Sequence, residues 1–206
     1  MIPFKRLFLL LAITAVMQGV ALAKSAQDYV SSAQQKSLNG DNQGAISDYK
    51  KAIELSPDYV PAYYNLAFFY QELSEYKKAV YNYSKVLELD PNMYVAYYAR
   101  AICEIKLLDF RSALDDLNIY IEHNPNSPFS YEYRAYAKRA LGEYEGSIAD
   151  YNKSIELNPE NIPSYVGRAI AEFKLGQIEA GCRDMKTASD KGYILAPEYL
   201  KKYCSK

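Results

Sequence analysis

The sequence lacks tryptophan, has one histidine and three cysteines among 206 residues, and shows almost no excess of either charge. Because there is a single histidine, a metal site built from several histidines is ruled out, and only His123 could serve a Ser/His or Cys/His mechanism. The formal net charge of −1 gives no electrostatic basis for binding nucleic acid. Neither a phosphate-binding glycine loop nor a Gly-x-Ser-x-Gly elbow occurs, so we expect a protein that is not an enzyme and uses no metal or cofactor.

The first 23 residues have the layout of a secretory signal peptide. Lys5 and Arg6 precede an apolar run from Leu7 to Met17, and small residues then lead to Ala21-Leu22-Ala23. The apolar run is short against the ~20 residues of a membrane-spanning helix. We therefore expect cleavage after Ala23 and export, to a bacterial periplasm or out of the cell. The alternative is an uncleaved leader, which would then anchor the chain to a membrane.

A 34-residue period runs through the rest of the chain in three separate columns. Within each period, apolar residues at i, i+3, i+4 and i+7 predict two amphipathic helices. Each closing proline ends the second helix, because it lacks an N–H and disfavours helical geometry in the preceding residue. The columns are Pro57, Pro91, Pro125 and Pro159; Tyr29, Tyr63, Tyr97, Tyr131 and Tyr165; and Ala33, Ala67, Ala101, Ala135 and Ala169.

This pattern resembles the tetratricopeptide repeat, whose signature has an aromatic residue, a later alanine, a second aromatic residue and a closing proline. Tyrosine takes the first aromatic slot in all five periods, which accounts for part of the 22 tyrosines. The resemblance implies an all-α, right-handed solenoid of five helix-turn-helix repeats. The implied segments are 26–59, 60–93, 94–127, 128–161, a degenerate 162–195, and a capping helix at 196–206.

The residues next to the closing prolines have the chemistry of helix N-caps. Asp58, Asn92 and Asn126 each follow a proline directly, and their side-chain oxygens suit the free N–H groups of the next helix. We expect all three to cap first helices.

A further column, Glu104, Lys138 and Glu172, alternates in sign at the same period. Stacked first helices would bring the three side chains together as a ladder of ion pairs, each worth ~0–1 kcal/mol if exposed. The alternative is three unrelated surface charges.

The resemblance also implies where a partner would bind, since the first helices of this family line a concave groove. The chain would then act as a protein–protein interaction scaffold that holds a peptide segment or helix of a partner protein. In the alternative interpretation, the aromatic side chains pack against neighbouring helices and only stabilise the fold. The residues expected to bind are Tyr64, Phe68, Tyr98, Ile102, Phe129, Tyr136 and Arg139.

Two other functions are weighed against this groove. Of the slots with which one group of the family grips a chaperone's C-terminal carboxylate, only Asn65 matches, so that function is rejected. An envelope assembly component that associates through its outer face or its termini, as a homo-oligomer or with other proteins, stays open.

The cysteines predict one disulfide and one free thiol. The last helix of the fifth repeat and the capping helix should form a hairpin that turns near Tyr193. Cys182 and Cys204 each lie eleven residues from that turn, so they should face each other. An exported compartment permits the bond, and Cys103 would stay reduced. The alternative is that Cys182 and Cys204 are both buried and reduced.

Overall fold

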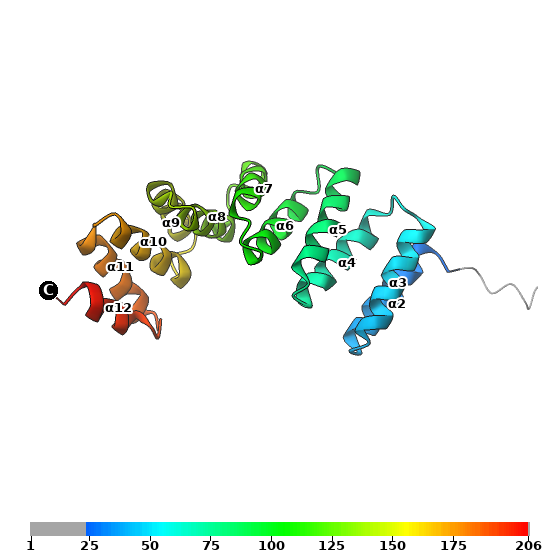
Figure 1. Ribbon diagram of the computed structural model, residues 1–206, viewed down its shortest axis with the longest axis horizontal. Helices are drawn as coiled ribbons and strands as arrows, with labels where there is room; N and C mark the ends of the chain where they lie inside the picture. The colour runs from blue at the N-terminus through cyan, green and yellow to red at the C-terminus, as the bar shows by residue number, and fades with distance from the viewer. Residues whose placement is uncertain (1–23, 206) are drawn as a thin grey trace, which may run out of the picture. The chain divides into compact units, whose positions relative to one another are not determined.

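The computed structural model describes residues 24–205, and every regular element within that range is an α-helix (Figure 1). Within residues 24–205 eleven helices, α2 to α12, follow one another, and the chain divides into two compact units after Ala62. The expected all-α repeat fold is therefore confirmed. The expected signal peptide lies outside the described residues. Between residues 24 and 205, no helix has both the length and the apolar character needed to cross a bilayer.

The first unit contains one helix pair, α2 (Ala26–Leu38) and α3 (Asn42–Leu55), packed against each other. A reciprocal cap fixes the start of α2: the Asp28 N–H donates to the Ser25 hydroxyl (3.2 Å), and the Ser25 N–H donates to the Asp28 carboxylate (2.8 Å). Ala45 is fully buried between the two helices, so their backbones approach closely.

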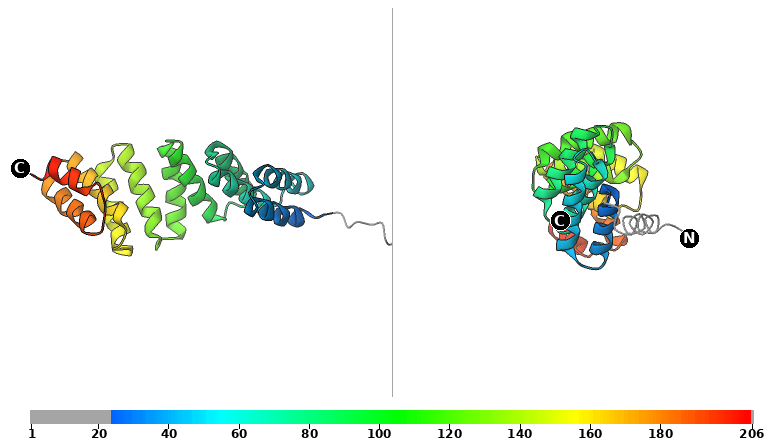
Figure 2. Two further views of the ribbon diagram at one scale, coloured as in Figure 1. Left: turned by 90° about the horizontal axis from the view of Figure 1, so that it is seen from below. Right: turned by 90° about the vertical axis from the view of Figure 1, so that its right-hand side faces the viewer.

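The second unit contains four helix pairs and a single final helix (Figure 2). Each helix from α5 onward packs on the next one, and α8 also contacts α6 and α10, the first helices of the neighbouring pairs. The pairs are α4 (Val60–Glu72, which begins at the end of the first unit) with α5 (Tyr76–Leu89), α6 (Tyr94–Lys106) with α7 (Phe110–His123), α8 (Pro128–Ala140) with α9 (Tyr144–Leu157), and α10 (Ile162–Lys174) with α11 (Ile178–Asp190); α12 is Ala196–Tyr203.

The turn inside each helix pair has a left-handed residue at the same position of the repeat. It ends the first helix by letting the next N–H donate to the carbonyl five residues back, as Asp109 does to Glu104 (2.9 Å). Glycine adopts this conformation without steric cost, but two repeats use a residue with a side chain. The five residues are Gly40, Ser74 (φ 58°), Leu108 (φ 63°), Gly142 and Gly176.

The expectation that Asn92 and Asn126 cap first helices is wrong. The cap residues of α6 and α8 are Met93 and Ser127, and neither makes a side-chain hydrogen bond to the helix. Each asparagine lies one residue too early, and the Asn92 side chain instead accepts a hydrogen bond from the Tyr94 hydroxyl (3.3 Å).

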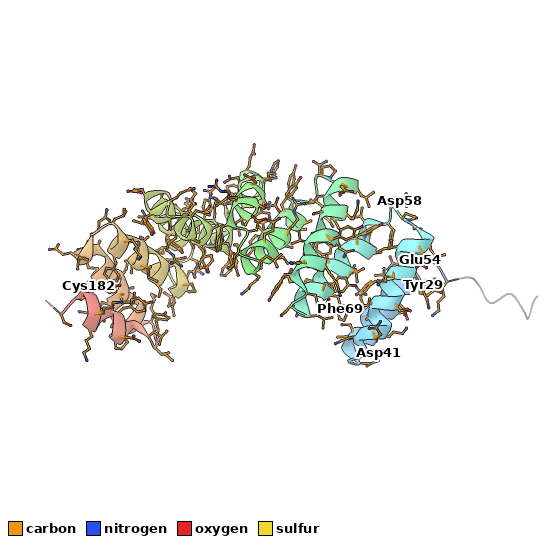
Figure 3. All side chains as sticks on the ribbon, viewed as in Figure 1. Tyr29, Asp41, Glu54, Asp58, Phe69 and Cys182 are labelled. Atoms are coloured by element: carbon orange, nitrogen blue, oxygen red, sulfur yellow. A yellow bond between two sulfur atoms is a disulfide. The ribbon has the colours of Figure 1, made fainter. Side chains whose placement is uncertain are left out.

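Two second helices are capped by aspartates that the sequence analysis did not select. Asp41, labelled in Figure 3, accepts from the Gly44 N–H (2.9 Å) at the start of α3, and Asp109 accepts from the Ser112 N–H (3.3 Å) at the start of α7. Both aspartates directly follow the left-handed turn residue, so one short turn ends one helix and begins the next.

The final helix, α12, stands where the first helix of a sixth repeat would begin. It starts one full repeat after the start of α10, and Tyr199 continues the tyrosine column one repeat beyond Tyr165. It packs on α11, and its Tyr203 ring stacks on Phe173 with centroids 4.4 Å apart. The capping helix implied by the sequence is therefore confirmed, and Met185 lies fully buried in the cluster that α12 covers.

Candidate functional site

A groove of about 540 Å³ lies in the second unit, across the first helices of three consecutive repeats. This volume is within the range of small-molecule and peptide-sized sites. Its walls come from α6, α8 and α10, its floor includes the α9 residue Tyr151, and Tyr193 from the α11–α12 turn also lines it. The other lining residues are Ile102, Ile105, Lys106, Leu108, Glu132, Tyr133, Tyr136, Arg139, Ile162, Pro163, Val166, Gly167 and Ile170.

Helical periodicity explains which side chains reach the groove. On α8 the lining residues Glu132, Tyr133, Tyr136 and Arg139 recur at i, i+1, i+4 and i+7, which is one face of a helix. On α10 the apolar lining residues are four positions apart in the sequence: Ile162, Val166 and Ile170. Each first helix therefore turns one stripe to the groove and another to its partner helix.

The floor of the groove is shaped by a close approach of α9 to α10. Tyr151 is 2 % exposed, and a Cβ at Gly167 would overlap its phenol ring. One repeat earlier the sizes in the equivalent slots are reversed: the smaller Leu117 belongs to a buried cluster against which the larger Tyr133 packs. At these two junctions the larger side chain thus comes from opposite helices, and Gly167 leaves room for the Tyr151 ring.

The groove is mostly apolar, but α8 contributes two charged side chains to it, Glu132 near its start and Arg139 near its end. Glu132 accepts a hydrogen bond from the Asn161 amide (2.8 Å), while burial raises the pKa of its carboxyl group. Arg139 lies over the Tyr136 ring, with its guanidinium carbon 5.2 Å from the centroid. Burial raises the pKa of the Tyr151 hydroxyl, although the charge of Arg139 and its hydrogen bond to this hydroxyl act in the opposite direction.

Of the residues expected to bind a partner, Ile102, Tyr136 and Arg139 line this groove. Tyr136 is 38 % exposed, so part of its ring is available to a ligand. Phe129 is 50 % exposed and lines a neighbouring hollow together with Glu132 and Asn161.

The other three expected residues lie elsewhere. Tyr98 packs against two other rings, with centroids 4.9 Å from Tyr120 and 5.9 Å from Tyr133, and burial raises the pKa of its hydroxyl. The Tyr64 ring meets Tyr83 edge-on at 5.7 Å. These two rings stabilise helix packing, which is the alternative interpretation weighed from the sequence. Phe68 is exposed on α4, outside the groove.

The sequence analysis missed a ladder of arginines that joins the repeats. Arg100 forms a bidentate pair with Asp116 of its own repeat (2.7 Å for both bonds) and donates to Ser84 of the repeat before it (2.9 Å). Arg134 does the same with Asp150 and Asn118, and Arg168 with Asp184 and Asn152. In repeats three to five the arginine and the aspartate each recur with the 34-residue period, and this was the available signal.

The hypothesis of an ion-pair ladder among Glu104, Lys138 and Glu172 is wrong. The Lys138 ammonium bonds within its own repeat, to Asp150 at 2.7 Å. The two glutamates occupy the same slot in repeats three and five, and each has one buried carboxylate oxygen without a hydrogen-bond partner among the described residues. Burial, together with the charge of the neighbouring aspartate, raises the pKa of each to about 7.

The three cysteines divide as a bonded pair and a single thiol. The structure joins Cys182 of α11, labelled in Figure 3, to Cys204 after α12, with Cα atoms 5.9 Å apart. Cys103 is fully buried, and its Sγ lies 3.4 Å from the Gln71 amide oxygen. Burial raises the pKa of this thiol to about 12, so the reactive thiolate is rare at neutral pH.

The described residues contain no arrangement that marks a metal centre. Between residues 24 and 205, no group of three or more His, Cys, Asp or Glu side chains is placed to hold a metal ion. His123 stacks on Tyr94 with centroids 3.7 Å apart, and its Nδ1 lies 3.1 Å from the Ile119 carbonyl oxygen. His123 therefore packs against a tyrosine ring and the backbone at the end of α7.

Comparison with known proteins points to one family. One family model, described as TPR repeat, matches residues 38–74 and 135–176, and another, described as Tetratricopeptide repeat, matches residues 60–93. A comparison with curated proteins gives no match.

Solved structures with the same fold cover most of the chain. A MamA protein is 24 % identical with a TM-score of 0.77, over 88 % of this chain and 96 % of that one. MamA from Desulfovibrio magneticus RS-1 (residue 41 to the end) is 22 % identical with a TM-score of 0.72, over 90 % and 100 %. YrrB, described as a TPR protein with an unusual peptide-binding site, is 20 % identical with a TM-score of 0.79, over 92 % and 97 %. With this sequence pattern and five helix pairs of the same period, the chain is a tetratricopeptide-repeat protein.

Proposed function

We propose that this protein is a non-enzymatic interaction scaffold that holds a segment of a partner protein in the α6–α8–α10 groove. The groove is the observation that carries the proposal: it is about 540 Å³, mostly apolar, open along one face of three helices, and bordered by a few polar side chains. Such a site favours an amphipathic segment over a strongly charged tail. The description of YrrB as a protein with a peptide-binding site supports the same kind of ligand.

We also propose that the scaffold works outside the cytoplasm. The signal-peptide pattern of residues 1–23 supports export. The Cys182–Cys204 bond adds to this support, because disulfides persist in oxidising compartments.

Site-specific photocrosslinking tests the groove. A photoreactive phenylalanine analogue replaces Tyr136 in the groove or, as the control, Tyr81 on the second helix α5, which is 62 % exposed. In cells of the source species, we expect Tyr136→analogue to give a discrete crosslinked protein and Tyr81→analogue to give none. Equal crosslinking at both positions, or crosslinking at Tyr81 alone, would contradict the proposal.

One observation favours the second candidate, an assembly component that associates through an end of the chain. Ile194 is 83 % exposed and Leu195 is 49 % exposed in the turn before α12. Two adjacent exposed aliphatic side chains suit a contact with another protein. Loss of an oligomer in the double variant Ile194→Ser/Leu195→Ser, with the Tyr136 crosslink retained, would identify this surface as a separate interface.

A further inference from the structure

The α6–α8–α10 groove holds two cationic side chains that have no carboxylate partner in the part of the chain that the structure describes. Lys106 and Arg139 both line it, and neither forms an ion pair with any residue that the structure describes. The arginines of the inter-repeat ladder differ, since each is bound to a buried aspartate. The Nε of Arg139 is buried without a hydrogen-bond partner from residues 24–205.

Arg139 is held in place within an apolar surrounding. Its guanidinium lies over Tyr136 and interacts with the Tyr151 hydroxyl, so its position is set before a ligand arrives. In such surroundings a charge-assisted hydrogen bond is stronger than at an open surface. The apolar residues flank it from both sides: Ile102 and Ile105 from α6, and Val166 and Ile170 from α10.

Glu132 limits how much negative charge the groove accepts. It lies on the same face of α8, two turns before Arg139, which is about 10 Å along the helix. Its carboxyl group is held by Asn161 and does not neutralise Arg139. A second carboxylate near that end would meet like charge and an apolar wall, so the arrangement favours one negative group in the occupant.

We infer that the segment bound in this groove presents one internal carboxylate, an Asp or Glu side chain between apolar residues, to Arg139. The inference rests on the proposed function and specifies the chemistry of the partner segment. A side chain within the segment fits better than a chain terminus, because α8 is the middle helix and apolar residues continue on both sides of Arg139. Lys106, which also lines the groove and forms no ion pair with a described residue, adds a second positive charge.

Capped synthetic peptides test this inference. An array of nonapeptides, acetylated and amidated so that they carry no terminal charge, has Ala, Leu, Val, Phe or Tyr at random around a central Glu, Gln or Lys. The purified protein with its disulfide intact is probed against the array. Peptides that bind are then titrated by fluorescence anisotropy. We expect Glu-centred peptides to bind about tenfold to hundredfold more tightly than their Gln counterparts, as for a hydrogen bond to a charged group.

Substitutions then assign the preference to Arg139. Arg139→Gln should remove the difference between Glu and Gln peptides and leave the weaker Gln binding in place. Arg139→Lys should keep part of the preference, and Arg111→Gln, at an exposed arginine on α7, should keep all of it. Thermal unfolding of each variant shows whether Arg139→Gln has lost the fold, in which case the Arg139→Lys titration decides.

The outcomes separate the inference from the proposed function. Equal binding of Glu and Gln peptides by the unmodified protein, lost on Tyr136→Ala, would overturn the carboxylate inference and leave the groove as a binding site. A Glu preference that survives in folded Arg139→Gln protein would also overturn it. Binding that Tyr136→Ala does not change, for every peptide, would remove the groove itself as the site.

Discussion

Leu108 has a backbone conformation that is costly for any residue with a Cβ. Its φ is 63°, and it occupies the turn slot where three other repeats have glycine and the second repeat has Ser74. The side chain gains little in return, because it is largely exposed. The steric cost of this region is ~1–2 kcal/mol, and the greater freedom of glycine in the unfolded chain offsets part of the gain from replacing Leu108.

Leu108→Gly is therefore expected to raise the free energy of unfolding by ~1 kcal/mol. Chemical denaturation followed by circular dichroism measures it. Leu89→Gly, at the last helical residue of α5, is the matched control and should lower stability by ~1 kcal/mol. A Leu108→Gly variant less stable than the parent would contradict the strain argument.

Glu104 gives a residue-scale prediction about pH. Its folded pKa is about 7, raised by burial, against an ordinary value of 4.5. The folded state therefore holds a proton that the unfolded state releases, so the contribution to stability is present below pH 4.5 and is lost as the pH rises through 7. Glu104→Gln should stabilise the protein by ~1–3 kcal/mol at pH 8 and by much less at pH 5.

Denaturation at several pH values measures this difference. Glu122→Gln, at an exposed position of α7, is the control and should change stability equally at both ends of the range. A Glu104→Gln effect of the same size at pH 5 and pH 8 would show that this carboxyl group does not titrate between them.

At the scale of helices, side-chain size fits adjacent repeats together. Tyr151 on α9 meets Gly167 on α10, whereas Leu117 on α7 meets Tyr133 on α8. Neither member of a pair is unusual alone. The sequence shows the four residues in equivalent slots, but which sizes meet follows only from the contact between a second helix and the next first helix.

Gly167→Ala tests this contact. The added Cβ overlaps the buried Tyr151 ring, so we expect a loss of ~1–3 kcal/mol in unfolding free energy. Tyr151→Leu in the same chain makes room, so the double variant should lose less than the sum of the two single losses. Gly146→Ala on α9 is the control: its Cβ would make only ordinary contact with the Lys138 stem and should be neutral or stabilising.

The disulfide gives a second prediction at this scale, because it fastens α12 to α11. Closing a loop of 22 residues is worth ~3 kcal/mol in the chain-entropy model. Cys204→Ser should therefore increase hydrogen exchange in α11 and α12 and leave α6 and α7 unchanged. Non-reducing peptide mapping of the unmodified protein should recover Cys182 linked to Cys204, with Cys103 alkylated only after denaturation. Three alkylatable thiols in freshly isolated, denatured protein would contradict the bond.

For the molecule as a whole, most of the fold could be predicted from the 34-residue periodicity of the sequence. The 34-residue columns of proline, tyrosine and alanine placed five helix pairs and a capping helix, because helical spacing and helix breaks are local properties of the chain. The site was predicted in part: Ile102, Tyr136 and Arg139 line the groove, whereas Tyr98 packs between Tyr120 and Tyr133. Which aromatic rings a neighbouring helix covers depends on packing between repeats, which the pattern of a single repeat does not contain.

Export is the prediction that concerns the entire chain. Protein recovered from the exported fraction should have the intact mass of a chain that begins at Lys24, since the signal-peptide pattern ends at Ala23. Deleting residues 7–17 should keep the protein in the cytoplasm. A mature protein that still begins at Met1, recovered with the membrane, would instead support the uncleaved anchor.

The unequal pairs Tyr151–Gly167 and Leu117–Tyr133 also bear on the order of assembly. Repeats of similar pattern can stack in the wrong order, within one chain or between two copies of the chain. If the fourth repeat were skipped, Leu117 would lie opposite Gly167, where a void opens. If α9 instead docked on α8 of another copy of the chain, Tyr151 would lie opposite Tyr133, where two rings compete for one space. Both mismatches would destabilise the misordered contact, one by overpacking and the other by leaving a cavity. The two unequal pairs therefore favour the native order of the third, fourth and fifth repeats over domain-swapped arrangements.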